Sequence, residues 1–296
     1  MYIRIGTRGS KLALAQTELV CRRMTEQGVD AETVIVKTQG DTVTDVPLHE
    51  IGGQGVFVRA LDEAILRGDI DAAVHSMKDI PASRPQGLSL CAVLARDSPA
   101  DFLIFEGDIS NVQTIGTSSM RRRAQLLRHD SSVTIKPLRG NLDTRIRRLV
   151  AGDFDAIVVA EAGIQRLGYQ VSGVRLPAHR FVPTANQGTV AVVCRDNPYL
   201  EDSFRVLDHM PTRKDVLLER MVMEEVGGGC YTPLGIYCRE GHLIAEALSL
   251  DGTRWKRIEE DIQDEQAARN LGRRLRDEAA DLITEALACV RCSDEG

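Results

Sequence analysis

Aromatic side chains and long apolar runs are both scarce in this sequence of 296 residues. Only 4% of the residues are aromatic, the chain has a single tryptophan, and its net charge is -6. Proteins that bind nucleic acid stack bases on aromatic rings and present positive charge to phosphates, so this class is disfavoured. No apolar run reaches the length of a membrane-spanning helix, and the first residues show no cationic segment followed by an apolar one. We therefore expect a cytoplasmic protein without a nucleic-acid or membrane partner.

The chain also lacks the cysteine pattern of a disulfide-stabilised protein. Its seven cysteines are odd in number and scattered, so we expect buried thiols rather than a disulfide framework. Cys289 and Cys292 have the spacing of metal ligands, but neither a second pair nor histidines lie nearby in the sequence, and we assign no metal. Cys230 lies in the glycine-rich stretch "GGGC", where an incidental cysteine is more frequent than a nucleophile.

Strands and helices alternate over the first two-thirds of the chain, which predicts mostly parallel sheets covered by helices. The apolar patterns predict strands at residues 3–5, 32–38, 72–75, 114–116, 133–138, 156–159 and 190–193, and helices at 11–26, 56–67, 120–128, 142–151 and 161–167. From residue 209 the pattern changes to a strand at 243–250 and an acidic amphipathic helix at 264–288. We predict an α/β domain 1 at 1–95 and 188–208, an α/β domain 2 at 96–187, and a small α+β domain at 209–296.

Polar clusters recur where a predicted strand ends and a helix begins. They read "GTRGS" (6–10), "HSMKD" (75–79), "GTSSMRRR" (116–123) and "RGNLDTR" (139–145). Ligands bind at this edge of open parallel sheets, and helix N-termini with arginines favour anions. Residues 121–166 hold nine arginines and one lysine against five acids. We expect Arg123, Arg128, Arg147 and Arg148 to lie on solvated helix faces, and the junction arginines to bind an anionic ligand.

Asp79 is an acid among these basic junctions. A carboxylate repels an anionic ligand, but it favours a reaction that creates a cation on that ligand. The alternative is a structural role, in which Asp79 pairs with Lys78 or caps a turn before Pro81. Adjacent side chains seldom face each other, so we interpret Asp79 as a chemical group.

The motifs together resemble the porphobilinogen deaminase, or hydroxymethylbilane synthase, family. The matching stretches are "IGTRGSKLALAQ" (5–16), "GGQGVFVRALDEAIL" (52–66), "AVHSMKDIP" (73–81), "GTSSMRRRAQL" (116–126), "LRGNLDTR" (138–145), "DAIVVAEAGIQRLG" (155–168) and "GGGCYTPLG" (227–235). They run in order over most of the chain. The resemblance implies two α/β domains like those of type II periplasmic binding proteins and a small α+β C-terminal domain that carries the cofactor-attachment cysteine.

The resemblance implies a transferase of heme biosynthesis that is a monomer. Such an enzyme joins four porphobilinogen molecules head to tail into hydroxymethylbilane and releases ammonia at each step. It builds the chain on one dipyrromethane cofactor, which is bound through a thioether to the cysteine that matches Cys230. Asp79 is then the catalytic acid and base, acting on the cation that forms when ammonia leaves.

The remaining site residues are carried over by motif match. The implied cofactor contacts are Lys78, Ser76, Thr117, Ser118, Ser119, Arg121, Arg122, Arg139, Gly140, Arg145 and Gln187, and the implied substrate contacts are Arg8, Ser10, Gln16 and Arg166. The sequence departs from the family pattern at Gln54, Glu161, Asn186 and Thr189. Two other classes stay open: a non-catalytic anion-binding protein of the same fold, and a regulatory domain that binds nucleic acid through residues 121–148.

Overall fold

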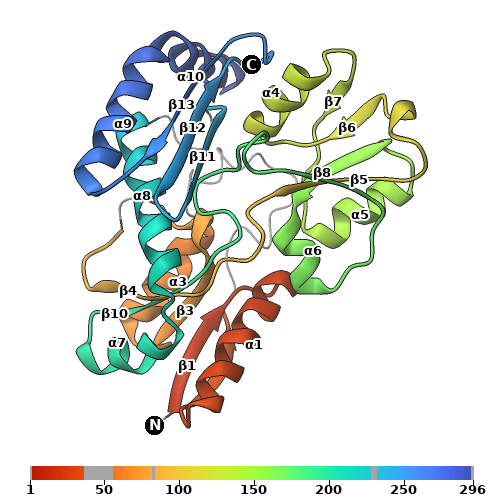
Figure 1. Ribbon diagram of the computed structural model, residues 1–296. Coiled ribbons are helices and arrows are strands. Elements are labelled where there is room, and N and C mark those ends of the chain that lie inside the picture. Colours follow the sequence, from red (N-terminus) through yellow and green to blue (C-terminus); the bar gives the residue numbers. More distant parts are fainter. Residues whose placement is uncertain (1, 37–55, 82–83, 228–231, 295–296) are drawn as a thin grey trace. The chain divides into compact units, whose positions relative to one another are not determined.

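The structure is a computed structural model that describes residues 2–36, 56–81, 84–227 and 232–294 (Figure 1). The chain forms two compact units. The first unit comprises Met1–Asp97, Gln165–Gly168 and Gly188–Arg213, and the second comprises Ser98–Ile164, Tyr169–Gln187 and Lys214–Gly296. The predicted division into three domains stays a prediction.

A five-stranded sheet forms the centre of the first unit, in the order β2-β1-β3-β10-β4. Its strands are β1 (Tyr2–Thr7), β2 (Asp30–Ile35), β3 (Ala72–Ser76), β4 (Leu88–Val93) and β10 (Val190–Arg195). Strand β1 runs parallel to β2 and β3, whereas β10 runs antiparallel to β3 and β4. The described part of this unit includes the helices α1 (Lys11–Glu26), α3 (Val56–Arg67) and α7 (Pro198–Phe204), followed by the start of α8 (Met210–Val226).

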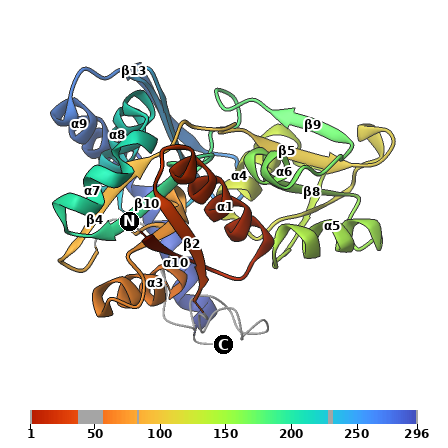
Figure 2. The same ribbon diagram turned by 90° about the horizontal axis from the view of Figure 1, so that it is seen from below.

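Helix α1 packs on one face of this sheet, beside β1 and β2 (Figure 2). It begins at Lys11 because the Ser10 hydroxyl accepts a hydrogen bond from the Ala13 N–H at 3.3 Å, which satisfies a free donor of the first turn. Its buried residues Val20 and Met24 join a core formed by alternate residues of the strands. The predicted helix at 11–26 is thus confirmed, and the cap and the apolar face explain why it forms.

The prediction of buried thiols is wrong for two cysteines. Cys91 and Cys194 form a disulfide between β4 and β10. The pairing of these strands shifts between Val192 and Val193, which face Ala92 and Leu90, so Cys91 is an extra residue on β4. Such a bulge redirects a side chain, and here it brings two distant cysteines of the sequence together. Cys21, Cys238 and Cys289 form no disulfide with another described residue.

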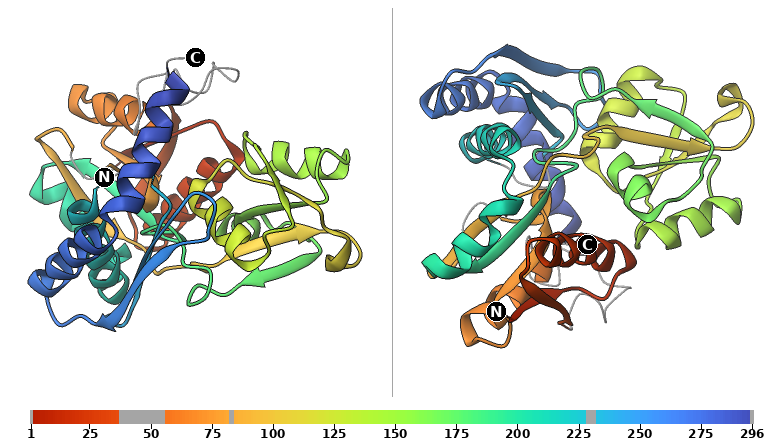
Figure 3. Two further views of the ribbon diagram at one scale, coloured as in Figure 1. Left: turned by 90° about the horizontal axis from the view of Figure 1, so that it is seen from above. Right: turned by 60° about the horizontal axis from the view of Figure 1, so that its bottom comes forward.

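The second unit contains a sheet of the same arrangement, in the order β7-β6-β8-β5-β9 (Figure 3). Its strands are β5 (Asp101–Phe105), β6 (Thr114–Gly116), β7 (Thr134–Lys136), β8 (Ala156–Ala160) and β9 (Gly173–Leu176). As in the first sheet, the central strand of the parallel part, β6, runs parallel to both β7 and β8. Strand β5 runs antiparallel to its neighbours β8 and β9. Helix α4 (Met120–His129) covers one face, and α5 (Leu142–Val150) and α6 (Glu161–Leu167) cover the other.

A smaller antiparallel sheet, β11-β12-β13, completes the second unit. It consists of β11 (Leu234–Arg239), β12 (His242–Leu248) and β13 (Trp255–Asp261), with α9 (Glu265–Glu278) and α10 (Ala280–Asp294) beside it (Figure 1). The single helix predicted at 264–288 is wrong, because the helix ends at Ala279 and a second one begins. Residues of α8, α9, α10 and the sheet share one core.

These three sheets confirm the predicted fold class of two type II periplasmic-binding-protein-like α/β domains and a small α+β domain. Within the described residues, no helix combines the length and apolar character needed to cross a membrane. No cluster of three metal-ligating side chains is found in the same part of the chain.

Arg128 ties the small sheet to α4, so the prediction that this arginine lies on a solvated face is wrong. Its Nη1 donates to Glu246 Oε2 at 2.6 Å, and the Glu246 side chain is 1% exposed. The guanidinium also lies 5.4 Å from the centre of the Trp255 ring. Nearby, Gly252 has a φ of +74°, and a Cβ there would lie 2.3 Å from the Ala124 carbonyl oxygen. This contact requires glycine.

We predict that Glu246→Ala lowers the free energy of unfolding of the second unit by about 3 to 5 kcal/mol, because it leaves the Arg128 charge partly buried without its partner. Urea unfolding measures the change. Glu260→Ala is the matched control, because Glu260 pairs with Arg274 at 3.0 Å on the exposed surface and such pairs contribute at most about 1 kcal/mol. Equal losses in the two variants would contradict the role given to Glu246.

Candidate active site

A short turn after β3 carries Lys78 and Asp79. The turn is a single 3-10 turn, Met77–Asp79, and the Met77 N–H donates to the Thr189 carbonyl at 2.9 Å. Met77 and Ile80 are buried and anchor the turn on both sides. Lys78 is therefore half-buried and Asp79 is exposed. The two side chains form no ion pair with each other, so the structural alternative of a Lys78–Asp79 pair is wrong.

Ser76 and Gln16 meet at the same end of β3. The Gln16 amide donates to the Ser76 hydroxyl at 3.0 Å, although the two residues lie 60 positions apart. Gln16 is buried in α1, whose start is capped by Ser10. Arg8 follows β1 and is half-buried. The first unit thus brings Gln16 and Ser76 into contact, while Ser10 has a structural role as the helix cap.

Three buried polar atoms at this edge have no hydrogen-bond partner within the described residues. They are Thr7 Oγ1 at the end of β1, His75 Nε2 in β3 and Thr189 Oγ1 just before β10. A buried polar group without a partner costs about 1 to 3 kcal/mol. Three of them on neighbouring strands therefore fit an edge that binds a polar ligand.

In the second unit, the hydroxyls of the "GTSS" motif hold the loop between β6 and α4. Thr117 Oγ1 accepts from the Ser119 N–H at 3.2 Å, Ser118 Oγ accepts from the Leu138 N–H at 3.0 Å, and Ser119 Oγ caps α4 by accepting from the Arg122 N–H at 3.4 Å. The same three hydroxyls were assigned to the cofactor. Their observed contacts shape the loop, and their contact with a cofactor stays a prediction.

Arg121 and Arg122 point inward and share one buried carboxylate. Arg121 Nη2 donates to Asp101 Oδ2 at 2.8 Å, and Arg122 Nη2 donates to Asp101 Oδ1 at 2.7 Å. Gln187 Nε2 reaches the same carboxylate at 3.0 Å. Burial alone would raise the pKa of Asp101, but the two guanidiniums outweigh it and hold that pKa well below its usual range. The cofactor role of the three partners stays a prediction, and the structure adds this internal role.

Arg145 differs from these two arginines. Its Nε donates to the Gly140 carbonyl at 2.8 Å, and within the described part of the chain no carboxylate pairs with it. Burial, together with the charge of Arg122, lowers the pKa of Arg145 to about 10. Gly140 has a φ of +103°, which favours glycine, and Arg139 beside it is exposed. A cation held next to another cation without an acid is suited to bind an anion.

Arg166, the last predicted substrate contact, belongs to the first unit. Its Nε donates to Asp97 Oδ2 at 2.7 Å and its Nη2 to the Gly188 carbonyl at 2.6 Å. Asp97 and Asp101 are functional candidates that the sequence reading missed. Both lie in the stretch "RDSPAD" (96–101), which none of the predicted site motifs includes. The sequence does contain a signal, because this short stretch between two predicted domains holds two acids, and acids at such a position can pair with the junction arginines.

Two departures from the family pattern have a physical explanation. Asn186 has a φ of +67°, the left-handed region that glycine prefers and asparagine tolerates best among other residues. Glu161 is buried, and its carboxylate pairs with Arg175 at 2.7 Å and accepts from the Ser98 hydroxyl. Its negative charge is thus neutralised. Cys230 and Gln54 lie outside the described residues.

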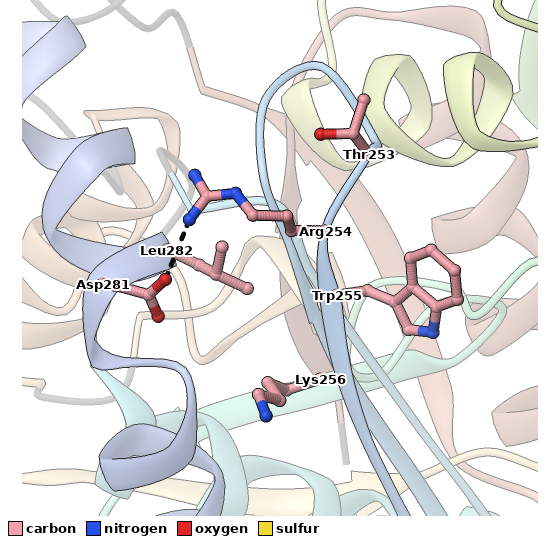
Figure 4. A pocket seen from close by; sticks show the side chains of 6 residues that line it. All are labelled: Thr253, Arg254, Trp255, Lys256, Asp281 and Leu282. Atoms are coloured by element: carbon pink, nitrogen blue, oxygen red, sulfur yellow. Dashed lines mark hydrogen bonds and ion pairs between the residues drawn. The ribbon is translucent and has the colours of Figure 1, made fainter.

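Two pockets of the second unit lie away from the predicted site residues. One, of about 490 Å³, has the lining side chains of Arg175, His179 and His242 among others. The other, of about 330 Å³, lies beside β13 and α10, where Arg254 reaches across to Asp281 at 2.9 Å (Figure 4). Neither pocket is lined by a residue carried over from the motifs. The pockets of the second unit therefore do not indicate where the predicted site lies.

We predict that His75 stays neutral well below neutral pH. Burial, followed by the charges of Arg84 and Arg8, lowers the pKa of His75 to about 3, whereas the unfolded chain takes up this proton near the ordinary histidine value, about 6.5. Stability from the neutral imidazole is therefore lost as the pH falls from about 6.5 toward 3. The free energy of unfolding of the wild type should fall relative to His75→Asn by about 1.4 kcal/mol per pH unit in this window.

Urea unfolding of both proteins at pH 7, 6 and 5 measures this difference. His242 is an internal control by NMR, because its hydrogen bonds to Glu259 and Asp261 raise its pKa, so its ring holds a proton at pH values where His75 has none. Stability curves that stay parallel from pH 7 to pH 5 would contradict the prediction.

Most of the chain matches one family of known proteins. Residues 3–200 match the family model "Porphobilinogen deaminase, dipyromethane cofactor binding domain", and residues 214–281 match "Porphobilinogen deaminase, C-terminal domain". A "Probable porphobilinogen deaminase" of Methanococcoides burtonii is 43% identical over 98% of this chain and 99% of its own length. A protein of the same name from Methanosarcina acetivorans is 48% identical over 92% of this chain and 90% of its own.

Solved structures with a similar fold include substrate binding domain 2 of Lactococcus lactis GlnP, which has a TM-score of 0.44 and 15% identity over 69% of this chain and 87% of its own. The ancestral amino-acid-binding protein AncCDT-1 has a TM-score of 0.37 and 14% identity over 70% of this chain and 87% of its own.

The family resemblance inferred from the motifs is confirmed by these matches, and so are the predicted enzyme class and the dipyrromethane cofactor at the level of the family. The two matched models cover most of the chain, including the small third sheet that the motifs matched only loosely. This chain belongs to the porphobilinogen deaminase family.

Proposed function

We propose that this protein deaminates four porphobilinogen molecules and polymerises them head to tail into hydroxymethylbilane on a covalently bound dipyrromethane primer, releasing ammonia. The observation that carries the proposal is the carboxylate of Asp79. It is exposed on a turn that buried neighbours hold in place, and it forms no ion pair with the adjacent Lys78. A carboxylate on such a turn that pairs with no cation among the described residues is available for acid and base chemistry.

Asp79 acts at two points of each addition. When the C–N bond of porphobilinogen breaks, ammonia leaves with the electron pair and a positive charge remains on the pyrrole unit, where the Asp79 carboxylate stabilises it. A new C–C bond then forms from the free α-carbon of the growing chain. The ring of the growing chain whose α-carbon forms this bond then loses its α-proton, and Asp79 accepts that proton and gives it to the next departing amine.

The arginines bind the carboxylates of the pyrroles. Porphobilinogen carries an acetate and a propionate, so each added unit brings two negative charges. Arg145 has no acidic partner within the described residues and lies near Arg122, and Arg139 is exposed beside it. Their guanidiniums offer paired N–H donors that match a carboxylate.

The dipyrromethane cofactor fits the residues present. The three buried polar atoms of Thr7, His75 and Thr189 supply hydrogen-bonding groups at the edge that holds Asp79, and Arg145 supplies a cation for a cofactor carboxylate. When bound, the cofactor supplies the pyrrole end to which the first substrate unit is joined. We assign its attachment to Cys230 by motif match. We also propose that the protein is a cytoplasmic monomer with three domains and no nucleic-acid or membrane partner.

Intact-protein mass before and after incubation with porphobilinogen tests the attachment. We expect the wild type to carry an increment of two linked pyrrole units that grows by single units with substrate, and Cys230→Ser to lack it, because serine cannot form the thioether. Cys238→Ser is the matched control, since Cys238 is a buried free thiol in β11. No increment in the wild type would favour the non-catalytic binding protein.

Asp79→Asn should slow ammonia release by about 100-fold or more, because the amide can neither accept nor return a proton and carries no charge. Ammonia is measured directly, and circular dichroism checks that the variant is folded. Asp196→Asn is a suitable control in the same unit, since Asp196 lies after β10 at the other end of the sheet. Release at the wild-type rate from Asp79→Asn would remove Asp79 from the mechanism.

A further inference from the structure

The guanidinium of Arg166 is held from one side. Nε and Nη2 lie along one edge of the group, and they donate to Asp97 Oδ2 at 2.7 Å and to the Gly188 carbonyl at 2.6 Å. The Asp97 N–H donates to the same Gly188 carbonyl at 3.1 Å. A closed ring of three hydrogen bonds therefore fixes the position and rotation of the guanidinium.

The opposite side of the guanidinium stays available. Arginine has five N–H donors in a rigid plane, and Nη1 of Arg166 donates to no residue that the structure describes. Because Asp97 and Gly188 use the edge formed by Nε and Nη2, they determine that Nη1 is the group presented to a ligand. The orientation follows from these two acceptors, since the guanidinium is planar.

The exposure of Asp97 distinguishes this pair from the one around Asp101. The Asp101 side chain is 0% exposed and is fully used by Arg121, Arg122 and Gln187. The Asp97 side chain is 42% exposed, so water screens its charge. Arg166 therefore keeps attraction for a second carboxylate, while its hydrogen bond to Asp97 remains.

The positions of Asp97 and Gly188 in the chain explain why they meet. Asp97 ends the first segment of the first unit, and Gly188 begins the last segment of the same unit. The two connections thus run side by side at this point, joined by the Asp97–Gly188 hydrogen bond. Gly188 has a φ of +86°, which a glycine adopts without strain and which sets the direction of its carbonyl.

We propose that Asp97 is a positioning residue for substrate binding: with the Gly188 carbonyl it holds Arg166 by its Nε–Nη2 edge and presents Nη1 to a carboxylate of porphobilinogen. This inference rests on the proposed function, in which Arg166 contacts the substrate. Asp97 itself touches no substrate atom, and it acts through the orientation of Arg166.

The test compares Asp97→Ala and Asp97→Asn in the holoenzyme. Alanine removes the acceptor of the Nε hydrogen bond, and we expect KM for porphobilinogen to rise about tenfold, since a hydrogen bond to a charged group contributes about 1.5 to 3 kcal/mol. The kcat should stay within about twofold, because Asp79 is unchanged. Asparagine keeps an acceptor oxygen, so KM should return to the wild-type value or fall below it.

Asp153→Ala is the matched control. Asp153 accepts from Arg148 Nε at 2.7 Å, and its side chain is 42% exposed, as for Asp97. Loss of this pair should leave both kcat and KM unchanged. Calorimetric titration of each variant with porphobilinogen gives the affinity independently of turnover, so the comparison holds even for a protein that releases no ammonia.

The outcomes separate the two proposals. A wild type without ammonia release refutes the proposed function, and the affinities of the Asp97 variants then still test the positioning role. A KM and an affinity for Asp97→Ala within twofold of the wild type would overturn that role. So would an equal rise in KM for the alanine and asparagine variants, because it would show that charge rather than hydrogen bonding matters.

Discussion

The buried carboxylate of Asp101 is the constraint on which the second unit depends. It begins β5 and binds Arg121 and Arg122 from the first turn of α4 and the Gln187 amide from the returning connection. One negative charge therefore faces two positive ones inside the unit. The Arg145 guanidinium adds a third cation near Arg122, and burial, together with the charge of Arg122, lowers its pKa to about 10. A buried surplus of positive charge is stabilised by an anion, which supports the proposal that this unit binds carboxylates.

The cations proposed to bind carboxylates and the acid proposed for catalysis belong to different units of the chain. The cations around Arg122 and Arg145 belong to the second unit, whereas Asp79 belongs to the first. Within the described residues no ion pair joins Asp79 to a cation, whereas two guanidiniums pair with Asp101 and hold its pKa well below its usual range. The proposed mechanism therefore assigns the structural role and the catalytic role to two different acids.

Local patterns predicted the fold where local forces determine it. The helix at 11–26 and the strand at 72–76 follow from the Ser10 cap and from a buried apolar run. The pattern failed where tertiary contacts decide. The bulge in β4 that joins Cys91 to Cys194 depends on the pairing of strands about 100 residues apart, and α8, which the sequence reading did not assign, has an apolar face that becomes evident only in its shared core with β11 and β12.

The sequence predicts a set of site residues, which stays a prediction, and it does not predict the contacts that these residues make. Junction motifs locate Gln16, Ser76 and Asp79 because parallel strands end at one edge. The acids that orient the arginines escape this reasoning, since Asp97 and Asp101 act on residues 20 to 69 positions away. The same holds for the departures: Glu161 looked like an added negative charge at the site, yet Arg175 neutralises it through a contact 14 positions along the chain. The sequence gives the sign of each charged side chain but not the residue with which it pairs. In this protein, that pairing determines whether a charged side chain can bind a ligand or stabilises the fold.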